Sequence, residues 1–338
     1  MAIRKPIVSV IGPSGRNLVP IWGRSLLGIT ITDQAGYESD EAVLRFSAPP
    51  FDPPKKGTRY QVKVGWAADA LALTGIYSVS RTRFGGDPET GERMEVVCRA
   101  ADFLDKMKAI ASAHYDKENG FGTAGSIFRA LAEEAGVPAV IASSIDGIEV
   151  PYRLRWNQSP LDFATDLADE VGAIVKPQAG RMVILERGAG KSASGKELPE
   201  IRIDHDPTYS WEAEIEERSS YGKVEATWFD DKKGRPQTET AETGREAGKD
   251  APMHVSPSKT DAKKGAAARA QQLSRYTGTA TFETVGRPEA VAGAPVVPSG
   301  YGSTIDAIKW EASGITHEIA PEEGWITTVE AETKETTK

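Results

Sequence analysis

Short alternating segments, each closed by glycine or proline, constrain the fold of this chain more than any other feature. In residues 61–66, Val62, Val64 and Trp66 share one face of an extended segment, and polar residues occupy the other. The 33 glycines and 21 prolines indicate many turns and short strands rather than long helices. Five such segments before residue 100 predict a small β-barrel or sandwich. They cover residues 29–32, 43–46, 61–66, 77–81 and 94–98, with a polar loop at 85–91.

The pattern changes after residue 100, where a helical period replaces the alternation. A short helix is expected at 101–107. A second begins near Thr123 and ends at Gly136, and a third runs from the N-cap Ser159 to Gly172. A hairpin over 173–185 follows. These elements predict a small α+β insert spanning 101–187.

The last part of the chain, 188–338, returns to short strands and predicts a second β-barrel-like domain. It opens with a Gly/Ser/Lys linker at 188–199. Residues 230–261 have no apolar periodicity, so we expect a long charged loop there. An Ala-rich helix at 266–273 leads into the closing strands, and the tail after Ala331 is expected to fray.

Charge and cysteine content exclude several classes of function. A net charge of −8 argues against a protein that binds nucleic acid sequence-specifically, which would cluster Lys and Arg. The single cysteine, Cys98, excludes an intrachain disulfide and, in an alternating strand, is expected in the core. We find no signal peptide and no run of ~18 apolar residues, so no stable membrane insertion is expected.

Two local motifs imitate functional sites. Residues 188–192, Gly-Ala-Gly-Lys-Ser, resemble the end of a phosphate-binding loop. Leu185 stands where that loop needs a glycine, and no apolar helix follows. Residues 204–206, Asp-His-Asp, resemble the start of a metal site, but in an extended segment His205 points away from both aspartates. We interpret these motifs as a linker and a solvated turn.

The remaining polar residues do not converge in sequence. His114, His254 and His317 have no second ligand at metal spacing, and His317 is expected at a strand edge. The adjacent glutamates 133–134, 216–217 and 322–323 diverge in a helix or strand, so they are interpreted as solvated. The sequence therefore predicts no catalytic, cofactor-binding or metal-ligating residues.

The seven tryptophans fall into two groups. Those on alternating strands are expected in cores, and those near the ends of elements are candidates for contacts between subunits. The first group is Trp66, Trp228, Trp310 and Trp325, and the second is Trp22, Trp156 and Trp211.

Several segments occur in an order that resembles one known family. Residues 94–103 end the first β region, 157–173 form the helix-and-hairpin unit, and 209–224 and the last seventy residues supply later strands. Together they resemble the phage late control protein D family, the baseplate hub of contractile tails. The amino-terminal half of type VI secretion spike proteins is similar. The charged 230–261 region departs from the family pattern.

The resemblance implies a mainly β fold with a small α+β insert and two β-barrel-like domains of the phage tail hub type. It also implies a structural, non-enzymatic protein without cofactors. A homotrimer would form a ring with approximate six-fold symmetry, joining the tail tube protein to the central spike protein and contacting other baseplate proteins. The expected location is the virion tail baseplate, after assembly in the host bacterial cytoplasm.

A ring of three such chains, each carrying −8, could present an acidic wall along which DNA or cargo passes without binding. Two alternatives remain open at this point. A tail-tip cell-wall hydrolase would need convergent carboxylates or a metal, and a glycan-binding tail protein would need exposed tryptophans in grooves.

Overall fold

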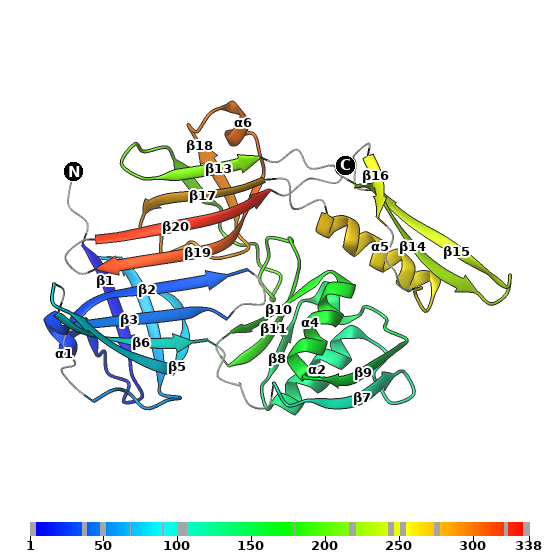
Figure 1. Ribbon diagram of the computed structural model, residues 1–338, viewed down its shortest axis with the longest axis horizontal. Helices are drawn as coiled ribbons and strands as arrows, with labels where there is room; N and C mark the ends of the chain where they lie inside the picture. The colour runs from blue at the N-terminus through cyan, green and yellow to red at the C-terminus, as the bar shows by residue number, and fades with distance from the viewer. Residues whose placement is uncertain are drawn as a thin grey trace.

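The computed structural model describes most of the chain (Figure 1). The described residues are 5–35, 39–47, 52–67, 69–89, 91–100, 107–178, 180–215, 221–242, 247–250, 255–273, 278–320 and 324–333.

One open sheet of twelve strands joins the beginning and the end of the chain. Its main path runs β1-β4-β5-β6-β3-β2-β19-β20-β17-β13. Strand β18 pairs with β19 on one side and with β12 on the other, so β12 joins the sheet through β18. The strands are β1 (Pro6–Ile11), β2 (Leu26–Gln34), β3 (Glu41–Ser47), β4 (Arg59–Trp66), β5 (Ala72–Asp87), β6 (Gly91–Arg99), β12 (Ile201–Asp204), β13 (Trp211–Ile215), β17 (Gly278–Val285), β18 (Pro295–Ser299), β19 (Trp310–Ala320) and β20 (Gly324–Thr333). The antiparallel pairing of β2 with β19 links the two β-barrel-like units, here called the N-terminal unit (β1–β6) and the C-terminal unit (β12, β13, β17–β20).

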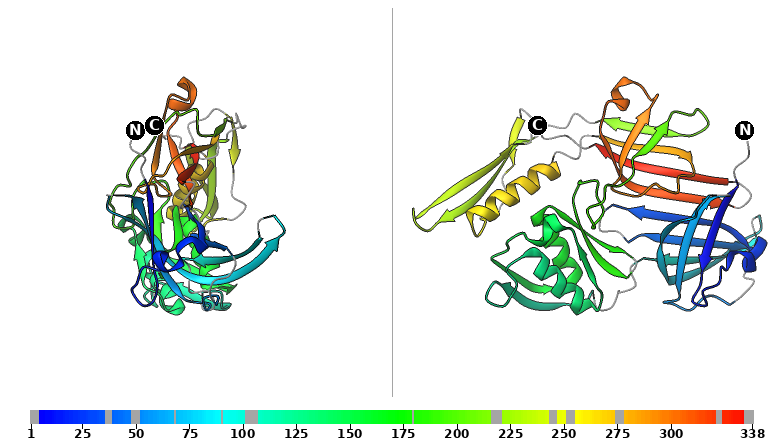
Figure 2. Two further views of the ribbon diagram at one scale, coloured as in Figure 1. Left: turned by 90° about the vertical axis from the view of Figure 1, so that its left-hand side faces the viewer. Right: turned by 180° about the vertical axis from the view of Figure 1, so that it is seen from behind.

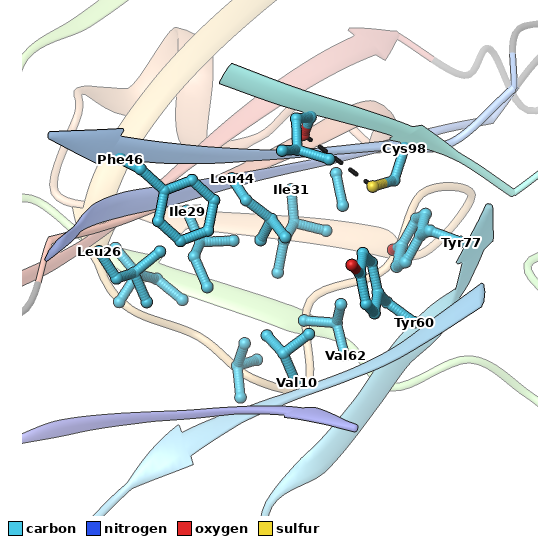
Figure 3. Packing of buried hydrophobic residues seen from close by; sticks show 14 of the residues in the cluster. Val10, Leu26, Ile29, Ile31, Leu44, Phe46, Tyr60, Val62, Tyr77 and Cys98 are labelled. Atoms are coloured by element: carbon cyan, nitrogen blue, oxygen red, sulfur yellow. Dashed lines mark hydrogen bonds between the residues drawn. The ribbon is translucent and has the colours of Figure 1, made fainter. Parts of the chain in front are cut away.

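The N-terminal unit encloses a core made by alternate residues of its strands. Figure 3 shows Leu44 and Phe46 of β3 pointing toward Val10 and Val62 of the facing strands. Cys98 lies in this core, as predicted, and is 1% exposed. Short helices α1 (Val19–Trp22) and η1 (Gly23–Ser25) precede β2.

The loop predicted at 85–91 is shorter than expected. β5 and β6 stay paired as far as Asp87 and Gly91, so they form one long hairpin. Glycines at 85 and 86 hid this pairing in the sequence, because glycine usually marks a turn or the end of a strand.

The insert has the predicted helices and hairpin, with its own core. Thr123 caps α2 by accepting from the backbone of Ser126, and Ser159 caps α4 in the same way from Asp162. Gly136 and Gly172 end the two helices in the left-handed conformation. Its elements are β7 (Ala111–Asp116), α2 (Ala124–Ala135), β8 (Ala139–Ile141), α3 (Ser143–Asp146), β9 (Tyr152–Gln158), α4 (Pro160–Val171), β10 (Ala173–Gln178) and β11 (Arg181–Glu186). The helix predicted at 101–107 falls mostly on residues outside the described part.

The prediction of a charged loop at 230–261 is wrong over its described residues. β14 (Tyr221–Asp230) pairs with β15 (Arg235–Glu242) and β16 (Ala247–Asp250), and α5 (Lys259–Leu273) covers them. We call this the arm; it projects beside the insert, where α5 lies close to α4 (Figure 1).

Within the arm, the middle of β14 and the second half of α5 were predicted, whereas β15, β16 and the start of α5 escaped prediction because the core of the arm uses very small side chains. Ala262, Ala266 and Ala270 line one side of α5 and pack on Val224 and Ala226 of β14. In strand β15, half-buried and exposed residues alternate, as in any strand with one covered face. The half-buried positions hold small or polar residues instead of large apolar ones, so the sequence shows no apolar period there.

The C-terminal unit packs β12, β17, β18, β19 and β20 around a separate core, with α6 (Ser303–Asp306) beside β18. Phe282 and Trp310 are its largest buried side chains and meet edge to face, with ring centroids 6.3 Å apart. Strand β20 stays paired up to Thr333, beyond the expected start of fraying at Ala331, and residues 334–338 lie outside the described part.

Two glycines on helices provide a matched test of close packing. A Cβ at Gly125 would lie 1.7 Å from Oδ1 and 2.8 Å from the backbone oxygen of Asp146, whereas a Cβ at Gly265 of α5 would meet nothing within 4 Å. We expect Gly125→Ala to lower the free energy of unfolding by ~1–3 kcal/mol through overpacking. Gly265→Ala should raise it by ~0.8–1 kcal/mol. Urea unfolding followed by circular dichroism measures both changes. Equal changes in the free energy of unfolding for the two variants would contradict the close packing of Gly125 against Asp146.

Candidate functional site

The most unusual chemical feature of the described chain is a buried cluster of three charged side chains. Lys176 of β10, in the insert, points its ammonium group at Asp33 of β2 and at Asp40, just before β3. Its Nζ lies 3.1 Å from Oδ1 of Asp40 and also hydrogen-bonds Oδ1 of Asp33. The side chains of Lys176 and Asp40 are 7% and 4% exposed, so water screens this contact weakly. The cluster ties the insert to the N-terminal unit.

Asp33 extends the same cluster into the C-terminal unit. Its Oδ2 accepts a hydrogen bond of 2.9 Å from the backbone N–H of Ala292. One carboxylate therefore contacts the insert through one oxygen and the C-terminal unit through the other, while its own backbone belongs to the N-terminal unit. We call Lys176, Asp33 and Asp40 the junction cluster, because it is where the three units meet.

The junction cluster holds more acid than base. One ammonium group faces two carboxyl groups, so the cluster is neutral only when one carboxyl carries a proton. Burial, assisted by the charge of Asp33 and opposed by Lys176, raises the pKa of Asp40 to about 7. Burial alone would lower the pKa of Lys176, yet the two carboxylates raise it, so the lysine stays charged.

A second buried network joins β19 and β20 through His317. Its Nδ1 lies 2.9 Å from Oγ1 of Thr327 and 3.4 Å from Nε1 of Trp325. The indole N–H can only donate, so Nδ1 is an acceptor and the proton of the neutral ring lies on Nε2. Thr327 Oγ1 in turn accepts from the backbone N–H of Arg287 at 2.9 Å. Burial lowers the pKa of His317 to about 4, which keeps it in this neutral, accepting form.

The same network reaches the N-terminal unit through paired tryptophans. The rings of Trp66 and Trp325 lie 5.1 Å apart, and Nε1 of Trp66 donates to the carbonyl of Gly286 at 3.1 Å. A Cβ on Gly286 would lie 2.1 Å from the Trp325 ring, so only glycine fits there. The packing of Trp66 against Trp325 therefore joins the two β units in addition to the β2–β19 pairing.

Several of the predicted positions lie as the sequence indicated. Asp206 forms a turn by accepting from the N–H and hydroxyl of Thr208, bonds that lower its pKa. The ring of His205 meets the ring of Tyr301 edge to face, with ring centroids 5.2 Å apart. Residues 188–192 are mostly irregular, with an isolated β-bridge from Lys191 to Glu197, and no helix starts there; His114 is exposed on β7.

Other predicted positions need correction. His317 is 3% exposed inside the sheet rather than at a strand edge, because β2, from the other end of the chain, pairs beside β19. Glu134 is more than a solvated acid, since it forms a two-pronged ion pair with the buried Arg155 at 2.8 and 3.0 Å. His254 and the glutamate pairs at 216–217 and 322–323 lie outside the described residues.

The tryptophans divide almost as predicted. Trp66, Trp310 and Trp325 are 8% exposed or less, whereas Trp228 is only half-buried in the arm. Trp22 is half-buried, with its ring packed against Phe46 at a centroid distance of 5.1 Å, and its role in contacts between subunits stays a prediction. Trp211 and Trp156 are 40% and 72% exposed.

The junction cluster was not predicted, although one sign of it was present. Lys176 interrupts the apolar run of β10, where a lysine is unexpected unless it finds a buried partner. Its partners lie more than a hundred residues away, so only the fold identifies them. Among the described residues, no group of three or more His, Cys, Asp or Glu could hold a metal ion. Nor does that part of the chain contain a helix long and apolar enough to cross a membrane.

Solved structures with the same fold include proteins of phage tails. The 43 kDa tail protein of prophage MuSo2 from Shewanella oneidensis aligns with a TM-score of 0.66 at 15% identity, over 96% of this chain and 98% of its own. A type VI secretion component of E. coli, itself similar to the T4 tail proteins gp27 and gp5, aligns with a TM-score of 0.54 at 12% identity. That alignment covers 91% of this chain and 73% of the other.

The sequence places the chain in a family. Residues 122–322 match the family of the phage tail baseplate hub (GPD), and the chain belongs to it. A protein named as the probable baseplate hub of Escherichia phage P2 is 25% identical, over 91% of this chain and 88% of the relative. The protein is thus a baseplate hub protein of a phage tail, as the resemblance implied.

Removing the ammonium group should destabilise the fold strongly. Lys176→Met would leave two carboxyl groups buried against each other, and we expect a loss of ~3–5 kcal/mol in the free energy of unfolding. The exposed Lys108→Met is the control, with an expected change within ~0.5 kcal/mol. Adding Asp33→Asn and Asp40→Asn to Lys176→Met should restore most of the loss. Urea unfolding tests this, and a mild Lys176→Met would contradict a structural role for the cluster.

Asp40 and His317 should give opposite pH dependences of stability. Between about pH 4 and 6.5 the folded chain keeps a proton on Asp40 that the unfolded chain has released, so stability falls as the pH rises. Over the same range folded His317 lacks a proton that the unfolded chain binds, so stability rises with pH. In the Asp40→Asn variant, where only His317 titrates, the free energy of unfolding should rise with pH. In the His317→Gln variant, where only Asp40 titrates, it should fall with pH, and each slope should reach up to ~1.4 kcal/mol per pH unit. Thermal unfolding at several pH values measures this, and slopes of the same sign in the two variants would refute the assignment.

Proposed function

We propose that this baseplate hub protein forms a homotrimeric ring that joins the tail tube protein to the central spike protein and lets DNA or cargo pass. The observation that carries the proposal is the continuous sheet formed through β2 and β19, which sets two β-barrel-like units side by side in each chain. Three chains would then supply six similar units. Such a ring can face a six-fold tube on one side and a three-fold spike on the other.

The open ends of the sheet support ring closure. Among the described residues, β1 pairs only with β4 and β13 only with β17, so each leaves one strand edge unpaired. Unpaired edges promote aggregation unless they are covered, and neighbours in a closed ring would cover them. Trp211, at the start of β13, is 40% exposed and is a candidate for this contact.

The junction cluster and the tryptophan network support the same role. A ring with six pseudo-equivalent units needs a fixed angle between the two units of each chain. The β2–β19 pairing, the contacts of Asp33 and the Trp66–Trp325 pair oppose bending at that boundary. The three units are proposed as domains of residues 1–100, 101–187 and 188–338. Their separate hydrophobic cores support the division, with the arm as part of the third.

The proposed location is the tail baseplate of the virion, after assembly in the host bacterial cytoplasm and in contact with other baseplate proteins. We propose no catalytic activity, no cofactor, no sequence-specific binding of nucleic acid and no stable membrane insertion. Any wall-degrading activity at the tail tip would then belong to a partner protein.

The mass of the purified protein in solution tests the ring. Light scattering behind a size-exclusion column should give a species near three times the chain mass of 36.3 kDa. Addition of the tube and spike proteins should move this species to a larger complex. A chain that stays monomeric even with both partners present would contradict the proposal.

A further inference from the structure

One turn of the insert contains a dipeptide whose chemistry favours modification. The chain has three asparagines, Asn17, Asn119 and Asn157, and of these Asn119 alone is followed by glycine. A backbone nitrogen can attack the side-chain carbonyl carbon of the asparagine before it. Glycine makes this attack easiest, because it has no side chain to shield its nitrogen and its backbone turns freely. The pair Asn119-Gly120 is therefore a candidate site of covalent change.

The turn that holds this pair is open to water. It follows β7, and residues 117–120 are all exposed. Figure 2 shows the insert in green, with this turn at the end that points away from the blue N-terminal unit. A Cβ at Gly120 would meet nothing within 4 Å. Water, which the modification consumes, therefore has free access to both residues of the pair.

One carboxylate holds Asn119 at two points. Oδ1 of Asp116, the last residue of β7, accepts a hydrogen bond of 2.8 Å from the backbone N–H of Asn119. Its Oδ2 accepts another of 2.8 Å from the side-chain Nδ2 of Asn119. Aspartate commonly stabilises a turn in this way, and hydrogen bonds to a charged acceptor are the stronger kind. Asp116 thus fixes both the main chain and the side-chain amide of Asn119.

The attacking nitrogen is also engaged in the turn. The backbone N–H of Gly120 donates to the carbonyl of Lys117 at 3.2 Å. Attack requires this nitrogen to lose its proton and approach Cγ of Asn119, while Nδ2 leaves. Both groups must therefore give up their present hydrogen bonds before they can react. The folded turn opposes the reaction that its sequence favours.

We propose that Asn119 is a site of spontaneous deamidation and that Asp116 limits its rate in the folded chain. The nitrogen of Gly120 forms a bond to Cγ of Asn119, the bond from Cγ to Nδ2 breaks, and ammonia leaves with the proton of Gly120. Water then opens the resulting imide ring. Attack at the main-chain carbonyl carbon gives isoaspartate, and attack at Cγ gives aspartate. In sum, asparagine and water become an acidic residue and ammonia.

The product cannot restore the turn. It has no Nδ2 donor for Asp116 and places a second negative charge beside it, so the two groups repel each other. The carbonyl of Asp116 accepts from the backbone N–H of Phe121 at 2.8 Å. The ring of Phe121 in turn packs edge to face on Tyr115, with centroids 5.2 Å apart, at the border of the insert core. Deamidation should therefore loosen this border as well as the turn.

Peptide mapping by mass spectrometry tests the proposal, after incubation of the whole chain near pH 8. In urea, Asn119 should react fastest of the three asparagines, and in the folded chain it should react much more slowly. Asp116→Ala should speed the reaction at Asn119 in the folded chain at least ~10-fold, which corresponds to ~1.4 kcal/mol in the barrier. Glu118→Ala is the matched control, because it removes the same charge from an exposed position of the same turn. It should change the rate by no more than ~2-fold.

The other two asparagines show whether a variant stays folded. Their rates should be the same in Asp116→Ala as in the wild type. If all three sites accelerate together, the variant has unfolded, and Asp116→Asn takes its place. That side chain keeps the shape of aspartate but only one acceptor oxygen, so Asn119 should react at a rate between those of the wild type and the unfolded chain.

Three results would overturn the proposal. Folded wild-type Asn119 that reacts as fast as in urea would show that the turn does not restrain it. Equal acceleration by Asp116→Ala and Glu118→Ala would assign the effect to charge rather than to the two hydrogen bonds. Asn119 that stays intact even in urea would exclude the site itself.

Discussion

The ammonium group of Lys176 lies in a buried site between carboxyl groups that belong to another unit of the chain. Each buried charge costs free energy that only its partners offset, so the three groups must remain together for the chain to stay folded. Asp33 passes this constraint to a third unit through Ala292. The relative positions of the units thus depend on a contact with little tolerance for displacement.

The opposite pH dependences of two buried titrating groups make the stability of the fold less sensitive to pH than either group alone would. Asp40 favours the folded state at low pH, and His317 favours it at higher pH, over nearly the same interval. Both groups lie where units meet, so the balance concerns the junctions rather than the cores.

The distribution of charge along the sheet has a direction that the net charge conceals. Strands β13, β17, β19 and β20 contain seven glutamates and no lysine or arginine, so the acidic residues gather at one end of the sheet. An acidic wall for the passage of DNA was expected from the net charge alone.

The sequence by itself determined the local elements of this protein. Alternation predicted the strands β2 to β6 of the N-terminal unit, and the N-caps and αL glycines predicted α2 and α4, because these signals act over a few neighbouring residues. The order of the motifs also indicated the family. Strands β15 and β16 of the arm were missed, since alanine, threonine and glutamate can build a small core without an apolar period. The junction cluster, the pairing of β2 with β19 and the burial of His317 were decided only by the tertiary structure. Each joins residues more than a hundred positions apart, and no local pattern records which distant strand or charge will become a neighbour.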